Sequence, residues 1–289
     1  MNESGLLDPG LMGRLERLQL ATRRPLAGRF IGERRSPRRG SSMDFADHRE
    51  YHPGDDHRRI DHHLFARLDL LFVKLFEAED DLTVRLLIDA SASMGLHGKL
   101  DCAKRAAAAL GFLALQRRNA VSVHTLPDLR APARFNNPTG LAGFLQHLGD
   151  VTAGGPTNFG AAAADLLRRP GPAGVTIVLS DLLSPEWEHA LRRLPARGSD
   201  VSVIQILCPE DLSPPGRGDL ELIDTETGHR VPVALSDDVV EAYAAQVDRW
   251  LDDISAGCRR ADAAHVMLGT DEDLESALIG SWREAGVLS

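Results

Sequence analysis

The sequence has few cysteines, few aromatic residues and no long apolar run. The three cysteines, Cys102, Cys208 and Cys258, are scattered and show no CxxC spacing. This argues against a disulfide framework or a thiolate zinc site and favours a reducing compartment. No apolar run approaches the roughly 20 residues that cross a bilayer, and the first residues lack the basic start and apolar core of a secretion signal. We therefore expect a cytoplasmic protein.

Charge is unevenly distributed along the 289 residues, whose net charge is −9. Between Arg14 and Arg39 there are nine arginines, opposed only by Glu16 and Glu33. This basic arm contains a single aromatic residue, Phe30. The remainder of the chain is strongly acidic, which argues against a general nucleic-acid binder. The arm is expected to be solvated and to pack on the acidic remainder, or to bind an acidic protein partner.

Apolar segments that favour strands alternate with amphipathic helices from about residue 80 onward. Strands are expected at 121–126, 175–181, 201–207 and 264–268, and helices at 98–118, 138–148, 159–169, 185–194, 238–259 and 271–286. A β-hairpin insertion is expected near 216–236. Two further strands are expected on either side of the acidic turn Glu77–Asp81. This alternation predicts an α/β fold with a doubly wound, mostly parallel sheet over 80–289, preceded by a small N-terminal module over 1–79 that begins with a helix at 7–20.

The stretch DASASMG, Asp89 to Gly95, follows the apolar run LTVRLLI and is expected at a strand end. A serine nucleophile is disfavoured, because there is no GxSxG elbow and Met94 stands where an SxxK motif requires lysine. A phosphate cradle is disfavoured as well, because the GxxxxGK[ST] pattern is absent. A phosphatase with an aspartyl nucleophile would usually have a second acid at Ser91.

A metal site fits this stretch better. Asp89, Ser91 and Ser93 at alternate positions could direct three oxygens toward one point as the strand ends. Thr157 in GGPTN and Asp181 in VLSD lie in segments expected to open on the same sheet edge. Carboxylate and hydroxyl oxygens suit Mg²⁺ or Mn²⁺, so these five residues are the predicted metal ligands.

DASASMG, Thr157 and Asp181, in this order, resemble the metal-ion-dependent adhesion site (MIDAS) of von Willebrand factor A domains. The resemblance implies a von Willebrand factor A-like fold, with Ser91, Ser93 and Thr157 as direct ligands of the metal. Asp89 and Asp181 would act directly or through waters. The remaining coordination position would accept an acidic side chain of a partner protein.

The segment 44–67, DFADHREYHPGDDHRRIDHHLFAR, resembles the signature of the bacterial domain-of-unknown-function family 58. The matching positions are Arg49, Tyr51, Gly54, Asp55, Asp56, Arg59, Ile60, Asp61, Ala66 and Arg67, and His62 replaces the usual tryptophan. Members of this family without membrane segments are commonly encoded beside MoxR-type AAA+ ATPases. The resemblance therefore implies a non-enzymatic, cytoplasmic adaptor that binds such an ATPase or its client.

The same segment leaves three alternatives open. Its Asp and Arg residues could lock the segment onto the main domain through ion pairs or form a partner-binding surface. His57, His62 and His63 with Asp55, Asp56 and Asp61 could instead form the metal centre of a phosphohydrolase.

Overall fold

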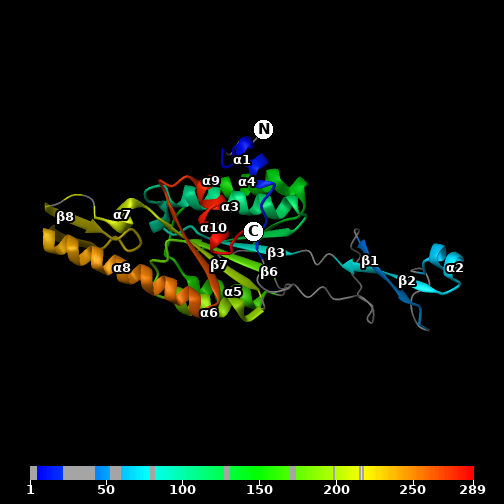
Figure 1. Ribbon diagram of the computed structural model, residues 1–289. Coiled ribbons are helices and arrows are strands. Elements are labelled where there is room, and N and C mark those ends of the chain that lie inside the picture. The colour runs from blue at the N-terminus through cyan, green and yellow to red at the C-terminus, as the bar shows by residue number, and fades with distance from the viewer. Residues whose placement is uncertain are drawn as a thin grey trace. The chain divides into compact units, whose positions relative to one another are not determined.

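A computed structural model describes residues 5–21, 43–52, 60–78, 82–126, 131–169, 174–197, 199–214, 216 and 218–289. The chain divides into two compact units (Figure 1). Unit 1 comprises residues 1–24 and 82–289, and unit 2 comprises residues 25–81. Unit 2 is thus inserted, in sequence, between the first helix and the rest of unit 1. In the described part of the chain, no helix combines the length and the apolar character needed to span a membrane.

A six-stranded sheet forms the centre of unit 1. Its strands, in spatial order, are β10 (Ala263–Gly269), β7 (Asp200–Leu207), β6 (Gly174–Ser180), β3 (Thr83–Asp89), β4 (Ala120–Leu126) and β5 (Ala133–Phe135). The pairs from β10 to β4 are parallel, and β5 pairs with β4 in the antiparallel direction. The expected α/β architecture with a mostly parallel sheet is therefore confirmed. Because the five parallel strands run the same way, their carboxyl ends share one edge.

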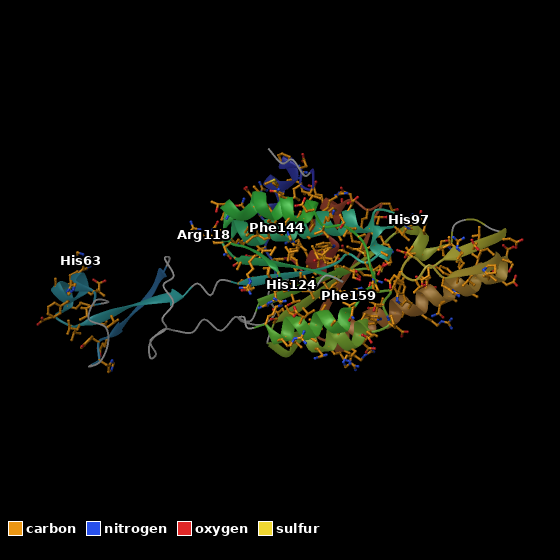
Figure 2. The ribbon with its side chains drawn as sticks, turned by 180° about the vertical axis from the view of Figure 1, so that it is seen from behind. His63, His97, Arg118, His124, Phe144 and Phe159 are labelled. Atoms are coloured by element: carbon orange, nitrogen blue, oxygen red, sulfur yellow. The ribbon has the colours of Figure 1, made fainter. Side chains whose placement is uncertain are left out.

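Helices cover both faces of this sheet (Figure 1). One face carries α1 (Pro9–Leu15), α3 (Lys99–Gln116), α4 (Leu141–Gly149), α9 (Leu274–Ile279) and α10 (Ser281–Glu284). The other face carries α5 (Phe159–Arg168), α6 (Trp187–Arg193) and α8 (Asp237–Arg260). Figure 2 labels one core aromatic side chain from each face, Phe144 of α4 and Phe159 of α5. Because both faces are covered, β6 is buried along its whole length and β7 from Val201 to Leu207, and both strands are mostly apolar.

Small residues allow the helices of unit 1 to approach one another closely. A Cβ at Gly111 of α3 would lie 2.1 Å from Phe144 Cζ, so the ring occupies the space that a side chain there would need. A Cβ at Gly257 of α8 would lie 2.4 Å from the ring of Trp187. The lack of a side chain at Gly111 thus allows α3 to contact α4 closely.

Residues 5–21 belong to unit 1, whereas the sequence grouped residues 1–79 as one module. Leu15 of α1 is fully buried. Residues 19–21 then pair with the last residues of the chain: the Gln19 and Ser289 backbones exchange hydrogen bonds of 3.2 and 2.9 Å, and Ala21 N–H donates to Val287 O at 3.0 Å. The hydrophobic spacing identified the helix, but it carries no information on which unit that helix contacts.

Unit 2 contains an antiparallel pair, β1 (Met43–Glu50) and β2 (Phe72–Ala78), and a short helix α2 (His62–Leu68). The two strands expected around Glu77–Asp81 do not form a hairpin with each other, because β2 pairs with β1 while β3 enters the central sheet. Strand β1 was not expected, since MDFADHRE is polar and reads as a loop. The basic arm beyond Ala21 lies outside the described residues.

The segment after β7 contains the short helix α7 (Pro209–Leu212) and an antiparallel hairpin of β8 (Gly218–Ile223) and β9 (Arg230–Leu235). The hairpin lies within the expected range 216–236 and leads directly into α8, the longest described helix. The helix expected over 271–286 is in fact two, because the chain leaves helical geometry at Gly280 (φ −95°, ψ −99°).

Candidate functional site

The floor of the candidate site is Asp89, the last residue of β3, whose side chain is fully buried. Its Oδ1 accepts a hydrogen bond from the Ser91 N–H (3.0 Å), and its Oδ2 accepts one from the Ser180 hydroxyl (2.7 Å). Burial raises the pKa of Asp89, and the nearby charge of Asp181 raises it further, while the hydrogen bonds from Ser180 and Ser91 oppose the shift. A cation bound beside Asp89 would stabilise the negative charges of the Asp89 and Asp181 carboxylates, which burial disfavours.

The two serines of the motif lie directly above this floor. Ser91 Oγ and Ser93 Oγ are 3.0 Å apart. Ser91 is fully buried and Ser93 is half-buried, so the pair leads from the floor toward solvent. Two oxygens that bind one octahedral Mg²⁺ at about 2.1 Å in adjacent positions are about 3.0 Å apart. The two hydroxyls are hydrogen-bonded to each other at a separation that would also suit neighbouring magnesium ligands.

The glycine-rich loop that contains Thr157 is bonded to the DASAS loop. Gly154 N–H donates to Ala90 O (2.8 Å), and Ala92 N–H donates to Gly155 O (2.9 Å). These two backbone hydrogen bonds fix the loop next to the serines and bring half-buried Thr157 to the same edge of the sheet. Asn158 then caps α5 by accepting from the Ala161 N–H at 2.8 Å.

Asp181 follows β6 at the same edge and is buried. Its Oδ1 accepts from the Leu183 N–H (3.2 Å). Between these residues, Leu182 adopts a left-handed backbone (φ 59°), and its N–H bonds to the Ser180 Oγ (2.9 Å). Non-glycine residues adopt this conformation at a cost of about 1–3 kcal/mol. The turn after β6 is therefore held in an unusual conformation beside the site.

Lys99, the first residue of α3, was not expected in the site. Its Nζ lies 2.9 Å from Asp181 Oδ2 and 3.2 Å from Asp211 Oδ1, and its side chain is almost fully buried. Burial lowers the pKa of Lys99, but the two carboxylates outweigh that effect, so the net shift is upward. One feature of the sequence could have indicated a special role for Lys99: it lies in the first turn of a helix, where the helix dipole disfavours a cation.

Lys99 also connects the site to the segment that precedes the hairpin. Asp211 Oδ2 accepts from the Cys208 N–H (3.0 Å), and the backbone O of Asp211 accepts from the Tyr243 hydroxyl of α8 (2.9 Å). Near the amino end of α3, the Nδ1 atom of His97 lies 3.5 Å from Glu210 Oε1; Figure 2 labels His97. The DASAS loop, α7 and α8 are thus joined at one end of the sheet.

The oxygen donors at this edge fit a hard divalent cation in type and charge. Asp89 and Asp181 provide carboxylates, and Ser91, Ser93 and Thr157 provide hydroxyls, as Mg²⁺ and Mn²⁺ require. In the described part of the chain no three His, Cys, Asp or Glu side chains are close enough to hold a metal ion by themselves. A cation here would therefore have to add hydroxyl, backbone or water oxygens to the carboxylates, and Lys99 reduces the negative charge that the site presents.

The family signature in unit 2 is only partly described. Gly54, Asp55, Asp56 and Arg59 lie outside the described residues, as do His57 and the side chain of Arg49. Asp61 is buried and caps α2 by accepting from the N–H groups of His63 (2.9 Å) and Leu64 (3.2 Å). Tyr51 is half-buried, and its N–H donates to Leu71 O (2.8 Å). Arg67 is exposed.

Two of the histidines proposed for a phosphohydrolase centre, His62 and His63, are exposed on α2. The phosphohydrolase alternative depends on the undescribed residues 53–59 and stays a prediction.

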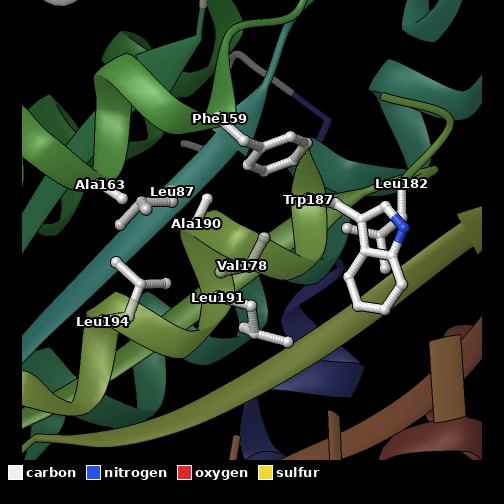
Figure 3. A pocket seen from close by; sticks show the side chains of 9 residues that line it. All are labelled: Leu87, Phe159, Ala163, Val178, Leu182, Trp187, Ala190, Leu191 and Leu194. Carbon is white, nitrogen blue, oxygen red and sulfur yellow. The ribbon is translucent and has the colours of Figure 1, made fainter. Parts of the chain in front are cut away.

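An apolar pocket lies between the sheet and the helices α5 and α6 (Figure 3). Its nine lining residues are Leu87, Phe159, Ala163, Val178, Leu182, Trp187, Ala190, Leu191 and Leu194. None of them is charged or carries a nucleophile. We therefore assign this pocket to core packing, even though Leu182 is adjacent to Asp181 in the chain.

Comparison with known proteins identifies the family. The model of the family described as "Protein of unknown function DUF58" matches residues 47–250. The chain belongs to this family. A relative of similar length, the uncharacterized protein Rv1480 of Mycobacterium tuberculosis (strain ATCC 25618 / H37Rv), is 32% identical over 282 residues, which covers 92% of this chain and 87% of the relative. The uncharacterized protein Mb1516 of Mycobacterium bovis matches to the same extent.

Among solved structures, this DUF58 chain is similar to the conserved hypothetical protein BatB from Bacteroides thetaiotaomicron. The sequence identity is 17% and the TM-score is 0.40, and the match covers 71% of this chain and 98% of the BatB chain.

Proposed function

We propose that this DUF58 protein is a non-enzymatic, cation-dependent protein-binding module with a von Willebrand factor A-like unit. Its site would hold Mg²⁺ or Mn²⁺ with Asp89, Ser91, Ser93, Thr157 and Asp181. The partner would provide a carboxylate as a further ligand. The observation that supports this most directly is the 3.0 Å spacing of the Ser91 and Ser93 hydroxyl oxygens above a buried carboxylate.

The buried residues and the half-buried residues of the site would have different roles. Buried Asp89 and Asp181 supply the negative charge that attracts a cation, and their hydrogen bonds with Ser180, the Leu183 N–H and Lys99 fix the carboxylate planes. Ser93 and Thr157, which are half-buried, lie where a partner's side chain would arrive. A bound cation would supply the positive charge for that carboxylate.

The sequence resemblance suggests the partner. A MoxR-type AAA+ ATPase, or a client of that ATPase, is the protein class that we propose to bind here. The chemistry of the site requires only that the partner exposes an Asp or Glu side chain that can reach between Ser93 and Thr157.

Cation binding is tested first by thermal unfolding in Mg²⁺, in Mn²⁺ and in EDTA. An ion at ten times its dissociation constant stabilises the fold by about 1.4 kcal/mol, which raises the melting temperature by about 3–6 °C for a chain of this size. Asp89→Asn and Ser93→Ala should abolish this increase. Asp252→Asn, at an exposed position on α8, is the matched control and should retain it. An equal increase in all four proteins would place the cation elsewhere.

Partner binding is tested by affinity capture of a purified MoxR-type ATPase. Wild type and Asp252→Asn should retain the ATPase in Mg²⁺ and lose it in EDTA, whereas Asp89→Asn should not retain it under either condition. Capture that is insensitive to EDTA and to Asp89→Asn would move the interface away from the DASAS loop.

A further inference from the structure

The turn of the β8–β9 hairpin reaches back to the candidate site. Glu226 Oε1 accepts hydrogen bonds from the Thr157 backbone N–H (3.3 Å) and the Thr157 hydroxyl (3.4 Å). The two residues are 69 positions apart in the sequence, and Glu226 is exposed to solvent. An in-chain carboxylate therefore already bonds to one of the five proposed ligand residues.

The turn that carries Glu226 is well defined by its own hydrogen bonds. Asp224 Oδ1 accepts from the N–H groups of Glu226 (2.8 Å) and Thr227 (3.1 Å), and these bonds lower the pKa of Asp224. The Thr227 hydroxyl accepts from the His229 N–H (3.3 Å), and Gly228 takes a left-handed conformation (φ 71°) that favours glycine. The backbone of the turn thus projects the Glu226 side chain in a defined direction, although every residue from Glu221 to Arg230 is exposed.

The distance between Glu226 and Thr157 is compatible with both residues binding one cation. The 3.4 Å between Glu226 Oε1 and Thr157 Oγ1 is close to the roughly 3.0 Å that separates adjacent oxygens on one Mg²⁺ ion. A hydroxyl that donates its hydrogen to a carboxylate keeps its lone pairs for a metal. The contact with Thr157 is long and exposed, so a cation can draw the carboxylate inward with little loss.

We infer that Glu226 is an in-chain carboxylate ligand of the cation site, so that a bound cation closes the β8–β9 turn onto Thr157. This inference rests on the proposed function. Glu226 then takes the outer position, and an acidic partner has to displace it before binding. The hairpin is therefore a cation-dependent cover of the site.

Mg²⁺ titration by calorimetry tests the ligand role in the full-length chain. Glu226→Gln keeps the size of the side chain but removes its charge, and it should weaken Mg²⁺ binding about tenfold or more. Asp219→Asn removes the same charge from an exposed position on β8 and should change the affinity less than twofold. If both variants lost Mg²⁺ affinity equally, Glu226 would act only through the net charge of the protein, and the inference would be overturned.

Hydrogen exchange tests the closure independently of affinity. In wild type and Asp219→Asn, saturating Mg²⁺ should slow amide exchange in residues 224–229 and in the 152–158 loop. In Glu226→Gln at saturating Mg²⁺, residues 224–229 should exchange as they do in EDTA. If Mg²⁺ protects the turn equally without the Glu226 charge, the inference is wrong.

The failure of this inference can be told apart from failure of the proposed function. If wild type binds Mg²⁺, Asp89→Asn does not, and Glu226→Gln binds like wild type, the cation site stands and the role of Glu226 is rejected. If wild type and Asp89→Asn are equally indifferent to Mg²⁺, the proposed function fails, and the inference fails with it.

Discussion

Lys99 and Asp181, which are 82 positions apart in the sequence, form a buried ion pair with 2.9 Å between Nζ and Oδ2. Both side chains are 2% exposed, so neither charge can be solvated if the other is removed. The pair joins the amino end of α3 to the turn after β6. It is therefore a structural bond and also a fixed positive charge at the edge of the candidate site.

Replacing Lys99 should reveal both roles. Lys99→Met leaves the Asp181 carboxylate buried and unpaired, which should lower the free energy of unfolding by about 3–5 kcal/mol. Asp211→Asn, which alters the outer and less buried partner, should lower it less. Urea unfolding in EDTA measures both. Mg²⁺ should restore more stability to Lys99→Met than it adds to wild type, because the released carboxylate regains a cationic partner. A Lys99→Met variant with the same free energy of unfolding as wild type would contradict this account.

Gly111 should not tolerate even the smallest side chain. In a free helix, alanine is favoured over glycine by about 1 kcal/mol. Here the added methyl group would overlap the Phe144 ring, so Gly111→Ala should lower the free energy of unfolding by about 1–3 kcal/mol.

Gly13 in α1 is the matched control for Gly111, because a Cβ there meets no atom within 4 Å. Gly13→Ala should be neutral or stabilising when both variants are compared by urea unfolding. Equal effects of the two substitutions would show that the α3–α4 contact is looser than described.

Acid should destabilise unit 1 through His124. Burial in β4, with the charges of Arg169 and Arg85 adding to it, lowers the pKa of His124 to about 4. In the unfolded chain this histidine titrates near 6.5. Between these two values the unfolded state binds more protons, so stability is full above about pH 6.5 and falls as the pH drops toward 4.

The loss that His124 contributes should be about 2–3 kcal/mol across this pH range. His124→Gln removes the titration while keeping a polar group near Ser122, which lies 3.2 Å from His124 Nε2. Urea unfolding at several pH values should therefore give a shallower pH dependence for the variant than for wild type. Parallel pH profiles would exclude His124 as the source.

Asp61 should stabilise unit 2 as a helix cap. Asp61→Ala removes the acceptor for the His63 and Leu64 N–H groups and should cost about 0.5–2 kcal/mol locally. Faster amide exchange in residues 63–68 is the expected readout. Asp61→Ser, which can still cap, should be intermediate, and exposed Arg67→Ala should leave exchange unchanged. Identical exchange in Asp61→Ala and wild type would show that the cap is not needed.

The sequence predicted best what depends on periodicity and strand direction. Buried parallel strands read as apolar runs, and parallel strands end at one edge, so the proximity of Asp89 and Asp181 could be expected. Strand β1 was missed because its ladder is made by the backbone while its side chains are polar. The break at Gly280 was missed because the apolar pattern continues across it.

The contacts between distant segments could not be predicted in this way. DTETGH indicates a turn, but the return of Glu226 to Thr157 depends on how the hairpin leaves α7 and enters α8. Lys99 stands out in the sequence only as a lysine in the first turn of a helix, and its burial depends on the carboxylates of Asp181 and Asp211 that the fold places around it. Side chains that bond across 69 to 112 positions are specified by the assembled fold and by no local pattern.

The pairing of residues 19–21 with residues 287–289 joins two segments of unit 1 that are separated in sequence by unit 2 and by the whole central sheet. Contacts between such distant segments carry a large loop-closure entropy, so this pairing is expected to form after the local helices and hairpins.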